Sequence, residues 1–292
     1  MEPNALDLIL ASPDISIVPG VYDALSARVA KRAGARAIYL TGFGVAGAAF
    51  GVPDIGLVSA TEMSDRVAAI APACEGVPLI ADGDNGHGGP LNAARLACAY
   101  ERAGAACIQL EDQVLPKRCG HMEDKEVIGR AEATQKIRAA AQARQSKAFK
   151  IMARTDARAT HGLDEALARG EAFLGAGADI LFIEAPRSAE ELRRVAETFP
   201  GVPLVANMVE DGKTPLLAPA ELQALGYRLL LYPISALLSV TQRLEEVYAL
   251  LLVGDRKALD ASRARFSHYN AIMKLPELLA VTERLARANE EE

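Results

Sequence analysis

Eight short apolar runs recur along this 292-residue chain, and each is followed by a polar or glycine-rich break and then by a helical pattern. The runs show no clean alternation of polar and apolar residues, as expected for parallel strands that are covered on both faces. They are Ile15–Pro19, Ala37–Thr41, Pro78–Asp82, Ala106–Glu111, Phe149–Arg154, Asp179–Glu184, Pro203–Asn207 and Arg228–Tyr232. Eight strand-then-helix units close most naturally into a (β/α)8 TIM barrel, which is the fold we predict.

The intervening segments contain helical patterns that end at glycine or proline, as helices often do. We predict helices at Ala24–Ala33, Asn92–Ala103, Leu163–Ala176, Ala189–Phe199 and Ala218–Leu225. The main alternative fold is a doubly wound open sheet, which would need a phosphate-binding loop after its first strand; VPGVYDALS does not supply one. Two or three further helical segments follow Ser235. We predict one domain, with a catalytic barrel at residues 1–253 and a C-terminal helical extension at residues 254–292.

The composition excludes several classes of protein. Half of the residues are hydrophobic and 24% are charged, which is the composition of a globular protein. The net charge is −6, so the chain has no excess of positive charge with which to bind nucleic acid. The apolar runs are too short to span a bilayer, and the first residues lack the pattern of a signal peptide. Four unevenly spaced cysteines fit a reducing compartment, so we expect a cytoplasmic protein without nucleic-acid or membrane partners.

Polar and ionisable residues gather where the apolar runs end. They are Thr41, Asp82, Asp84, Glu111, Asp112, Arg154, Asp156, Glu184, Asn207 and Glu210. Barrel enzymes build their active sites at the carboxyl ends of the strands, so these side chains should converge at one mouth of the barrel. The alternative is that strand ends are polar because they meet water, but this explains the strong bias toward acids poorly.

The segment DGDNGHGG contains the sharpest acidic motif. Asp82 and Asp84 leave a buried strand into glycines and can present oxygens to one cation, while Glu111 and Asp112 can join through waters. Mg²⁺ prefers oxygen ligands and commonly takes only one or two carboxylates. We therefore predict a Mg²⁺ site, with Mn²⁺ as a substitute; the alternative is a pair of turn aspartates.

The segment PKRCGH places a thiol in an electropositive setting. Cys119 is flanked by Lys117, Arg118 and His121, and neighbouring cations favour the thiolate. The adjacent glycine and proline indicate a mobile segment, and such segments after barrel strands often exclude water from the site. We predict that Cys119 is catalytic, whereas the other three cysteines have apolar or helical surroundings typical of packing residues.

Two further strand ends suit carboxylate binding. Arg154 ends a strand in IMARTDA, where a guanidinium can hold a substrate carboxylate in a bidentate manner. An ion pair with Glu184 or Asp156 is the alternative, and both roles are compatible. The segment TGFG, which begins at Thr41, offers a hydroxyl and backbone N–H groups to carboxylate oxygens.

Taken in order, YLTGFGVA, DGDNGHG, EDQ with PKRCGH, ARTDA, EAP and ANMVEDGKTP resemble the isocitrate lyase/phosphoenolpyruvate mutase superfamily. The resemblance runs from about Val18 to about Leu251, and K-R-C-G-H is similar to the carbon–carbon lyase branch. Two departures stand out. Thr41 replaces a more usual serine, and His87 occupies a position where the superfamily commonly has an aromatic residue.

The resemblance implies roles for individual residues. Tyr39, Thr41, Gly42 and Phe43 would line the 2-oxoacid side of the site, Arg154 and Asn207 would hold a substrate carboxylate, Glu184 would lie at the edge, and Asp54 would join Asp82, Asp84 and Glu111 near the metal. We place Tyr39, Lys117 and His121 beside Cys119 as candidate catalytic residues. The general base remains open between Tyr39, Glu111 and a metal-bound water. Phe43, His87, Met208 and Pro233 are candidates for the pocket that selects the substrate's side group.

The implied activity is Mg²⁺-dependent cleavage of a 2-hydroxy di- or tricarboxylate, of the 2,3-dimethylmalate or 2-methylisocitrate type, to a 2-oxoacid such as pyruvate and a carboxylate. Oxaloacetate hydrolysis or decarboxylation and phosphonomutase chemistry of the carboxyphosphonoenolpyruvate type are alternatives with the same site. A catalytically silent barrel is a third possibility, which the intact set of acids, arginine and cysteine disfavours. The resemblance also implies a homotetramer built as a dimer of helix-swapped dimers.

Overall fold

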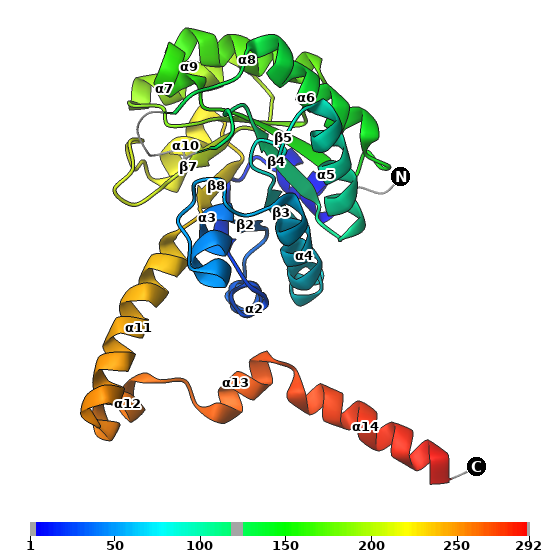
Figure 1. Ribbon diagram of the computed structural model, residues 1–292, viewed down its shortest axis with the longest axis vertical. Coiled ribbons are helices and arrows are strands. Elements are labelled where there is room, and N and C mark those ends of the chain that lie inside the picture. Colours follow the sequence, from blue (N-terminus) through cyan, green and yellow to red (C-terminus); the bar gives the residue numbers. More distant parts are fainter. Residues whose placement is uncertain (1–3, 118–124, 291–292) are drawn as a thin grey trace. The chain divides into compact units, whose positions relative to one another are not determined.

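The computed structural model describes residues 4–117 and 125–290. The chain forms two compact units, Met1–Leu237 and Leu238–Glu292. The first unit is a barrel whose strands lie at the centre with helices around them (Figure 1). The predicted division into a barrel at residues 1–253 and an extension at residues 254–292 stays a prediction.

The barrel contains eight parallel strands in the described residues, one for each predicted apolar run. They are β1 (Ser16–Val21), β2 (Ile38–Leu40), β3 (Leu79–Asp82), β4 (Cys107–Glu111), β5 (Lys150–Thr155), β6 (Ile180–Ile183), β7 (Val205–Asn207) and β8 (Leu229–Tyr232). Each strand pairs with the next in sequence from β1 to β6, β8 pairs with both β1 and β7, and a parallel bridge between Leu181 and Leu204 joins β6 to β7. The predicted (β/α)8 barrel is therefore confirmed.

Helices that follow strands β1 to β7 surround the barrel, and one further helix, α1, precedes β1. In the first unit they are α1 (Ala5–Ala11), α2 (Ala24–Arg32), α3 (Gly42–Val45), a π-helical turn η1 (Ala46–Phe50), α4 (Ala60–Ile70), a 3-10 turn η2 (Ala71–Cys74), α5 (Pro90–Arg102), α6 (Arg130–Ala143), α7 (Ala157–His161), α8 (Leu163–Gly175), α9 (Ala189–Thr198) and α10 (Pro219–Leu225). The residues after α2 and α5 include Gly34 at φ 92° and Gly104 at φ 95°, a left-handed backbone that glycine adopts without a steric penalty. These two predicted helix ends are correct for the predicted reason.

The part of the chain after β8 contains four helices in the described residues, where the sequence predicted two or three. They are α11 (Ser235–Val253), α12 (Arg256–Ser262), α13 (Phe266–Ile272) and α14 (Leu275–Glu290). Gly254 and Lys274, both with positive φ, follow α11 and α13. The prediction failed here because helices of about two turns carry too little periodicity to be counted separately.

The apolar core has two layers, one inside the barrel and one between the strands and the surrounding helices. Val18, Ile80 and Met152 belong to the inner layer, together with Leu6 and Ile9 of α1. Because Leu6 and Ile9 cluster with strand residues that face inward, α1 packs against the barrel interior. Full burial of side chains of this size contributes about 1.5–3 kcal/mol each, which makes the barrel a firm frame for the residues at its strand ends.

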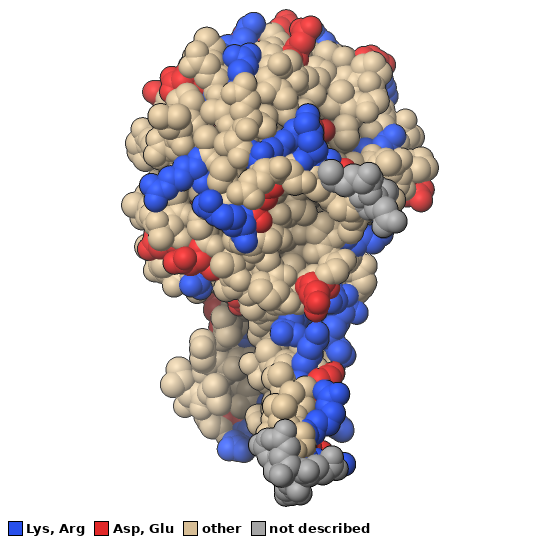
Figure 2. All heavy atoms as spheres, turned by 90° about the vertical axis from the view of Figure 1, so that its right-hand side faces the viewer, with Lys and Arg blue, Asp and Glu red and all other residues tan. Residues whose placement is uncertain are grey.

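The surface carries charges of both signs. On the face shown in Figure 2, basic and acidic side chains are interspersed over the barrel. Across residues 4–117 and 125–290, no helix has the length and apolarity that crossing a membrane requires.

Candidate active site

The side chains that face the barrel interior change from apolar to polar toward the carboxyl ends of the strands. In β4, Cys107 belongs to the inner apolar layer, and Gln109 and Glu111 follow it at intervals of two residues. In β5, Met152 of the same layer is followed by Arg154. Because successive side chains of a strand point to opposite faces, this spacing keeps the polar side chains on the inner face. The packing that builds the core thus also aims the site residues.

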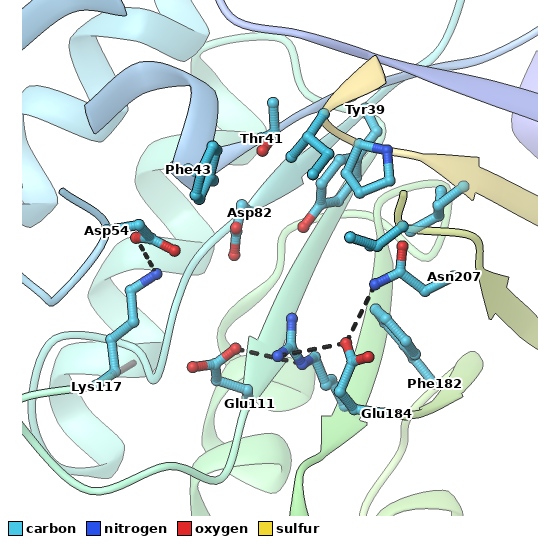
Figure 3. Close-up of a pocket in the computed structure, with 15 residues that line it drawn as sticks. Tyr39, Thr41, Phe43, Asp54, Asp82, Glu111, Lys117, Phe182, Glu184 and Asn207 are labelled. Carbon is cyan, nitrogen blue, oxygen red and sulfur yellow. Dashed lines mark hydrogen bonds and ion pairs between the residues drawn. The ribbon is translucent and has the colours of Figure 1, made fainter. Parts of the chain in front are cut away.

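The polar side chains converge on one pocket, drawn in Figure 3. Among the predicted site residues, those that line it are Tyr39, Thr41, Phe43, Asp54, Asp82, Glu111, Lys117, Arg154, Glu184 and Asn207. Phe182, Val209, Leu231, Pro233 and Ile234 complete the lining. Two other predicted residues, Gly42 and Asp84, contact this set directly through Asp82 and Lys117. Cys119 and His121 lie outside the described residues, so their roles and the predicted mobile segment stay predictions.

Asp82 is held by three donors from three parts of the chain. Its Oδ1 accepts hydrogen bonds from Asp84 N at 3.1 Å and Gln109 Nε2 at 3.2 Å, and its Oδ2 accepts one from Gly42 N at 3.1 Å. Tyr39 donates its hydroxyl to Gln109 Oε1 at 3.0 Å, which fixes the amide that holds Asp82. The Gly42 N–H is one of the backbone groups of TGFG considered for carboxylate oxygens, and in this structure it donates to Asp82. The predicted contact of Gly42 with substrate stays a prediction.

The pKa values of this cluster are set mainly by burial. Burial, followed by the neighbouring Asp84 carboxylate, raises the pKa of Asp82 to about 6. Burial also raises the pKa of Tyr39 well above its usual value, with a smaller contribution from Asp82. Tyr39 therefore remains protonated at neutral pH and acts in this structure as a hydrogen-bond donor.

Lys117 joins two acids that come from separate segments. Its Nζ lies 2.5 Å from Asp54 Oδ1 and 2.7 Å from Asp84 Oδ1, and all three side chains are nearly buried. Burial lowers the pKa of Lys117, but Asp84 and Asp54 outweigh it, so the pKa is raised well above the usual value. The ammonium is thus a permanent positive charge on the acidic side of the pocket.

Arg154 lies between three carboxylates. Its Nε is 2.9 Å from Asp156 Oδ2 and 3.4 Å from Glu111 Oε2, and its Nη2 is 3.3 Å from Glu184 Oε2. Figure 3 labels Glu111 and Glu184, and dashed lines drawn from them mark their ion pairs with Arg154. The guanidinium carbon also lies 5.2 Å from the centre of the Phe182 ring, within cation–π range. The ion pairs considered as an alternative from the sequence are therefore present, on a side chain that still lines the pocket.

The carboxylates fit a hydrated divalent cation. Glu111 Oε1 is buried and has no hydrogen-bond partner in residues 4–117 and 125–290, and burial raises the pKa of Glu111 well above its usual value. Within the same residues, no three His, Cys, Asp or Glu side chains are close enough together to bind one metal directly. Mg²⁺ takes one or two carboxylates and keeps several waters, so Asp82 as a direct ligand, with other acids reached through waters, matches this geometry.

Some predicted site residues take other positions. Asp112 faces away from the pocket: its carboxylate accepts hydrogen bonds from Thr155 Oγ1 at 2.6 Å and from Arg169 Nη1 at 2.9 Å. Its expected link to the metal through waters is therefore wrong, since the residue after Glu111 points to the opposite face of the strand. Met208, a candidate for the side-group pocket, is buried in the outer apolar layer.

The remaining candidates for the side-group pocket are Phe43, Pro233 and His87, and they do not all line the pocket. Phe43 and Pro233 line the pocket as predicted. His87 lies beside the acids, with Nε2 3.8 Å from Asp84 Oδ2, and burial lowers its pKa.

Two residues of the site, Gln109 and Lys125, were not predicted from the sequence. Gln109 is fully buried, and its only signal was its place between two inward-facing positions of β4. Lys125 Nζ lies 2.7 Å from Asp156 Oδ1, and both side chains are almost completely buried. Nothing in the sequence around Lys125 distinguishes it from a solvated lysine.

A (β/α)8 barrel with titratable groups converging at the carboxyl ends of its strands has the architecture of an enzyme. Residues 7–252 match the phosphoenolpyruvate phosphomutase family. The chain is 46% identical over 279 residues to 2,3-dimethylmalate lyase of Eubacterium barkeri, covering 95% of this chain and 96% of that protein. It is 42% identical over 243 residues to 2-methylisocitrate lyase of Bacillus subtilis (strain 168), covering 83% and 79%.

The comparison with solved structures indicates the same relatives as the comparison of sequences. A crystal structure of 2,3-dimethylmalate lyase superposes with a TM-score of 0.91 at 37% identity, covering 98% of this chain and 96% of that one. Phosphonopyruvate hydrolase in complex with oxalate and Mg²⁺ superposes with a TM-score of 0.85 at 30% identity, covering 96% and 97%. The chain belongs to the phosphoenolpyruvate mutase/isocitrate lyase superfamily. Within it, the protein is a carbon–carbon lyase.

Proposed function

We propose that the protein cleaves a 2-hydroxy di- or tricarboxylate, of the 2,3-dimethylmalate or 2-methylisocitrate type, to a 2-oxoacid such as pyruvate and a carboxylate, with Mg²⁺ as cofactor. The observation that carries the proposal is the pocket in which Asp54, Asp82 and Glu111 face Arg154 and Asn207. Its acidic side suits a divalent cation, and its Arg154 side suits a substrate carboxylate. The named relatives support this substrate class.

Each reacting group has a place in this scheme. Asp82 would hold Mg²⁺, with Asp54, Asp84 and Glu111 reaching it through waters, and Mn²⁺ would substitute. When bound, Mg²⁺ supplies Lewis-acid polarisation of the oxygen that becomes the new carbonyl. Arg154 and Asn207 would orient a substrate carboxylate, with Glu184 beside Arg154. Thr41 and Phe43, which line the pocket, and Gly42, which binds Asp82, would lie at the 2-oxoacid end.

Cleavage requires one base and one acid. We propose Glu111 as the base, because burial raises its pKa and its Oε1 faces no donor in the described residues, whereas Tyr39 is held as a donor. The base takes the proton of the 2-hydroxyl, the C2–C3 bond breaks, and C2 becomes the carbonyl of the 2-oxoacid. The electron pair passes to C3 of the departing fragment, which Cys119 would protonate as a general acid, with His121 and Lys117 keeping the surroundings positive.

A substrate panel tests this proposal. The purified protein is assayed with 2,3-dimethylmalate, 2-methylisocitrate, oxaloacetate and phosphonopyruvate, and release of pyruvate and oxalate is followed. We expect pyruvate from one of the first two, loss of activity with EDTA and recovery with Mg²⁺. Oxalate from oxaloacetate, or conversion of phosphonopyruvate alone, would instead assign the hydrolase or phosphonomutase alternative.

We further propose that the second unit mediates assembly into the helix-swapped homotetramer. Leu252, Val253, Phe266 and Leu285 are each more than 60% exposed, which is unusual for a water-facing surface. Sedimentation analysis should give the mass of four chains, and a monomer at micromolar concentration would contradict this. The cytoplasmic location also stays a prediction, which cell fractionation would test.

A further inference from the structure

A buried lysine and aspartate lie directly behind Arg154. Asp156 is fully buried, and its two carboxylate oxygens accept hydrogen bonds from Arg154 Nε at 2.9 Å and Arg154 Nη2 at 3.1 Å. Lys125 Nζ lies 2.7 Å from the same Oδ1 that receives Nη2. Asp156 therefore connects Lys125 to the arginine of the pocket.

The backbone around this pair is fixed independently. Asp156 N donates to Asp112 Oδ1 at 2.9 Å, and Arg169 Nη1 binds both Asp112 Oδ2 at 2.9 Å and Ile128 O at 2.8 Å. Ile128 N in turn donates to Asp112 O at 2.9 Å. The segment that carries Lys125 is thus tied to the ends of β4 and β5, so the position of Lys125 does not depend on its own ion pair alone.

The charges explain why a lysine is needed here. Asp156, Glu111 and Glu184 surround Arg154, and each of these carboxyl groups that is ionised offsets part of the positive charge of the guanidinium. An arginine neutralised in this way would attract a carboxylate ligand weakly. Lys125 brings a second positive charge to Asp156. Because Asp156 is then shared between two cations, it offsets less of the positive charge that Arg154 presents to the pocket. Consistently, Arg154 and Lys125 hold the pKa of Asp156 below its usual value although burial acts in the opposite direction.

We propose that Lys125 is a positioning residue for substrate binding: through Asp156 it keeps the guanidinium of Arg154 oriented and positively charged toward a carboxylate of the substrate. This inference rests on the proposed function for the identity of the substrate, but the carboxylate-binding role of the pair can be measured without turnover. Lys125 contacts no substrate in this scheme and acts only through Asp156 and Arg154.

The test compares Lys125→Met, Lys125→Arg and a matched control, Lys150→Met. Lys150 lies at the opposite end of the strand that carries Arg154 and pairs with Asp7 Oδ1 at 2.6 Å, so its replacement also removes a lysine–aspartate pair from β5. The dissociation constant of oxalate in the presence of Mg²⁺ is measured by calorimetry, and KM and kcat are measured with the substrate identified by the panel. We expect Lys125→Met to raise the oxalate dissociation constant and KM by about tenfold with a smaller change in kcat, Lys125→Arg to restore both, and Lys150→Met to change neither.

A double-mutant cycle with Arg154→Met separates this role from a structural one. If Lys125 acts through Arg154, Lys125→Met will have little further effect on oxalate affinity once Arg154 is replaced. Fully multiplicative effects, or an unchanged oxalate affinity in folded Lys125→Met, would overturn the proposal. If the wild type turned over nothing in the panel, the proposed function would fail, while oxalate affinity would still decide the role of Lys125.

Discussion

Lys117 Nζ lies 2.7 Å from Asp84 Oδ1, so an ammonium group is paired with one of the acids proposed for the cation site. The same nitrogen contacts Asp54, which comes from a different loop of the barrel mouth. Lys117 therefore compensates acids that would otherwise repel one another when no divalent ion is bound. If Mg²⁺ binds at these acids as proposed, we expect the stability of the protein and its affinity for Mg²⁺ to be interdependent.

Replacing Lys117 by methionine should make folding depend on Mg²⁺. Removing one partner of a buried charge pair typically costs about 3–5 kcal/mol, because the remaining charges stay buried without compensation. We expect thermal unfolding of Lys117→Met in EDTA at a clearly lower temperature than for the wild type, with a larger recovery on adding Mg²⁺. Lys150→Met serves as the control for loss of a lysine. Equal stabilisation of wild type and Lys117→Met by Mg²⁺ would contradict the assignment.

Gly42→Ala should weaken Mg²⁺ binding indirectly, by displacing the carboxylate of Asp82. A Cβ at Gly42 would lie 2.9 Å from Asp82 Oδ2, so the carboxylate must shift from its present hydrogen bonds. Changes beside a metal ligand typically cost about 10–100-fold in affinity, and we expect a loss in this range by calorimetry. Gly175→Ala is the matched control, because its Cβ would meet no atom within 4 Å. Tight Mg²⁺ binding by Gly42→Ala would show that Asp82 is not a direct ligand.

Mg²⁺ binding should release a proton below about pH 6. Burial raises the pKa of Asp82 to about 6 in the metal-free protein, above its unfolded value. Because the pKa of Asp82 is higher in the folded state, the folded state binds this proton more tightly than the unfolded state does. The protonated carboxyl therefore stabilises the folded state at low pH, and this stabilisation is lost as the pH rises through 6. A cation must displace this proton. Calorimetry in buffers of different ionisation enthalpy should show release of close to one proton at about pH 5 and almost none at pH 8; no release at the lower pH would refute the role of Asp82.

Cys119→Ser should lower kcat by at least about 100-fold with little change in KM, because loss of a general acid affects the chemical step and not substrate binding. The residue lies outside the described part of the chain, so this prediction rests on the K-R-C-G-H motif alone. Cys98→Ser, at a half-buried cysteine of α5, is the control and should retain full activity. Turnover by Cys119→Ser close to that of wild type would remove the assigned role.

The superfamily and most of the pocket could be predicted because their signals are local. Arg154 and Glu184 end apolar runs, and the period of two in a strand fixes which of their neighbours share their face. The same rule, applied more strictly, would have separated Glu111 from Asp112 and identified Gln109. It could not have identified Lys125, whose partner lies 31 positions along the chain.

The sequence by itself determined the eight strands, the four predicted helices that end at Gly34, Gly104, Gly177 and Gly226, and the acidic character of the barrel mouth. It could do so because apolar periodicity and backbone preferences act over a few residues. Only the tertiary structure decided the pairings: Gly42 N–H with Asp82, Lys117 with Asp54 and Asp84, and Lys125 with Asp156. These contacts depend on which segments the closed barrel brings within about 3 Å of one another. At that range, the strength of hydrogen bonds and of interactions between buried charges depends on the orientation of single side chains. The alternation of side chains along a strand gives the face on which a residue lies but not this orientation.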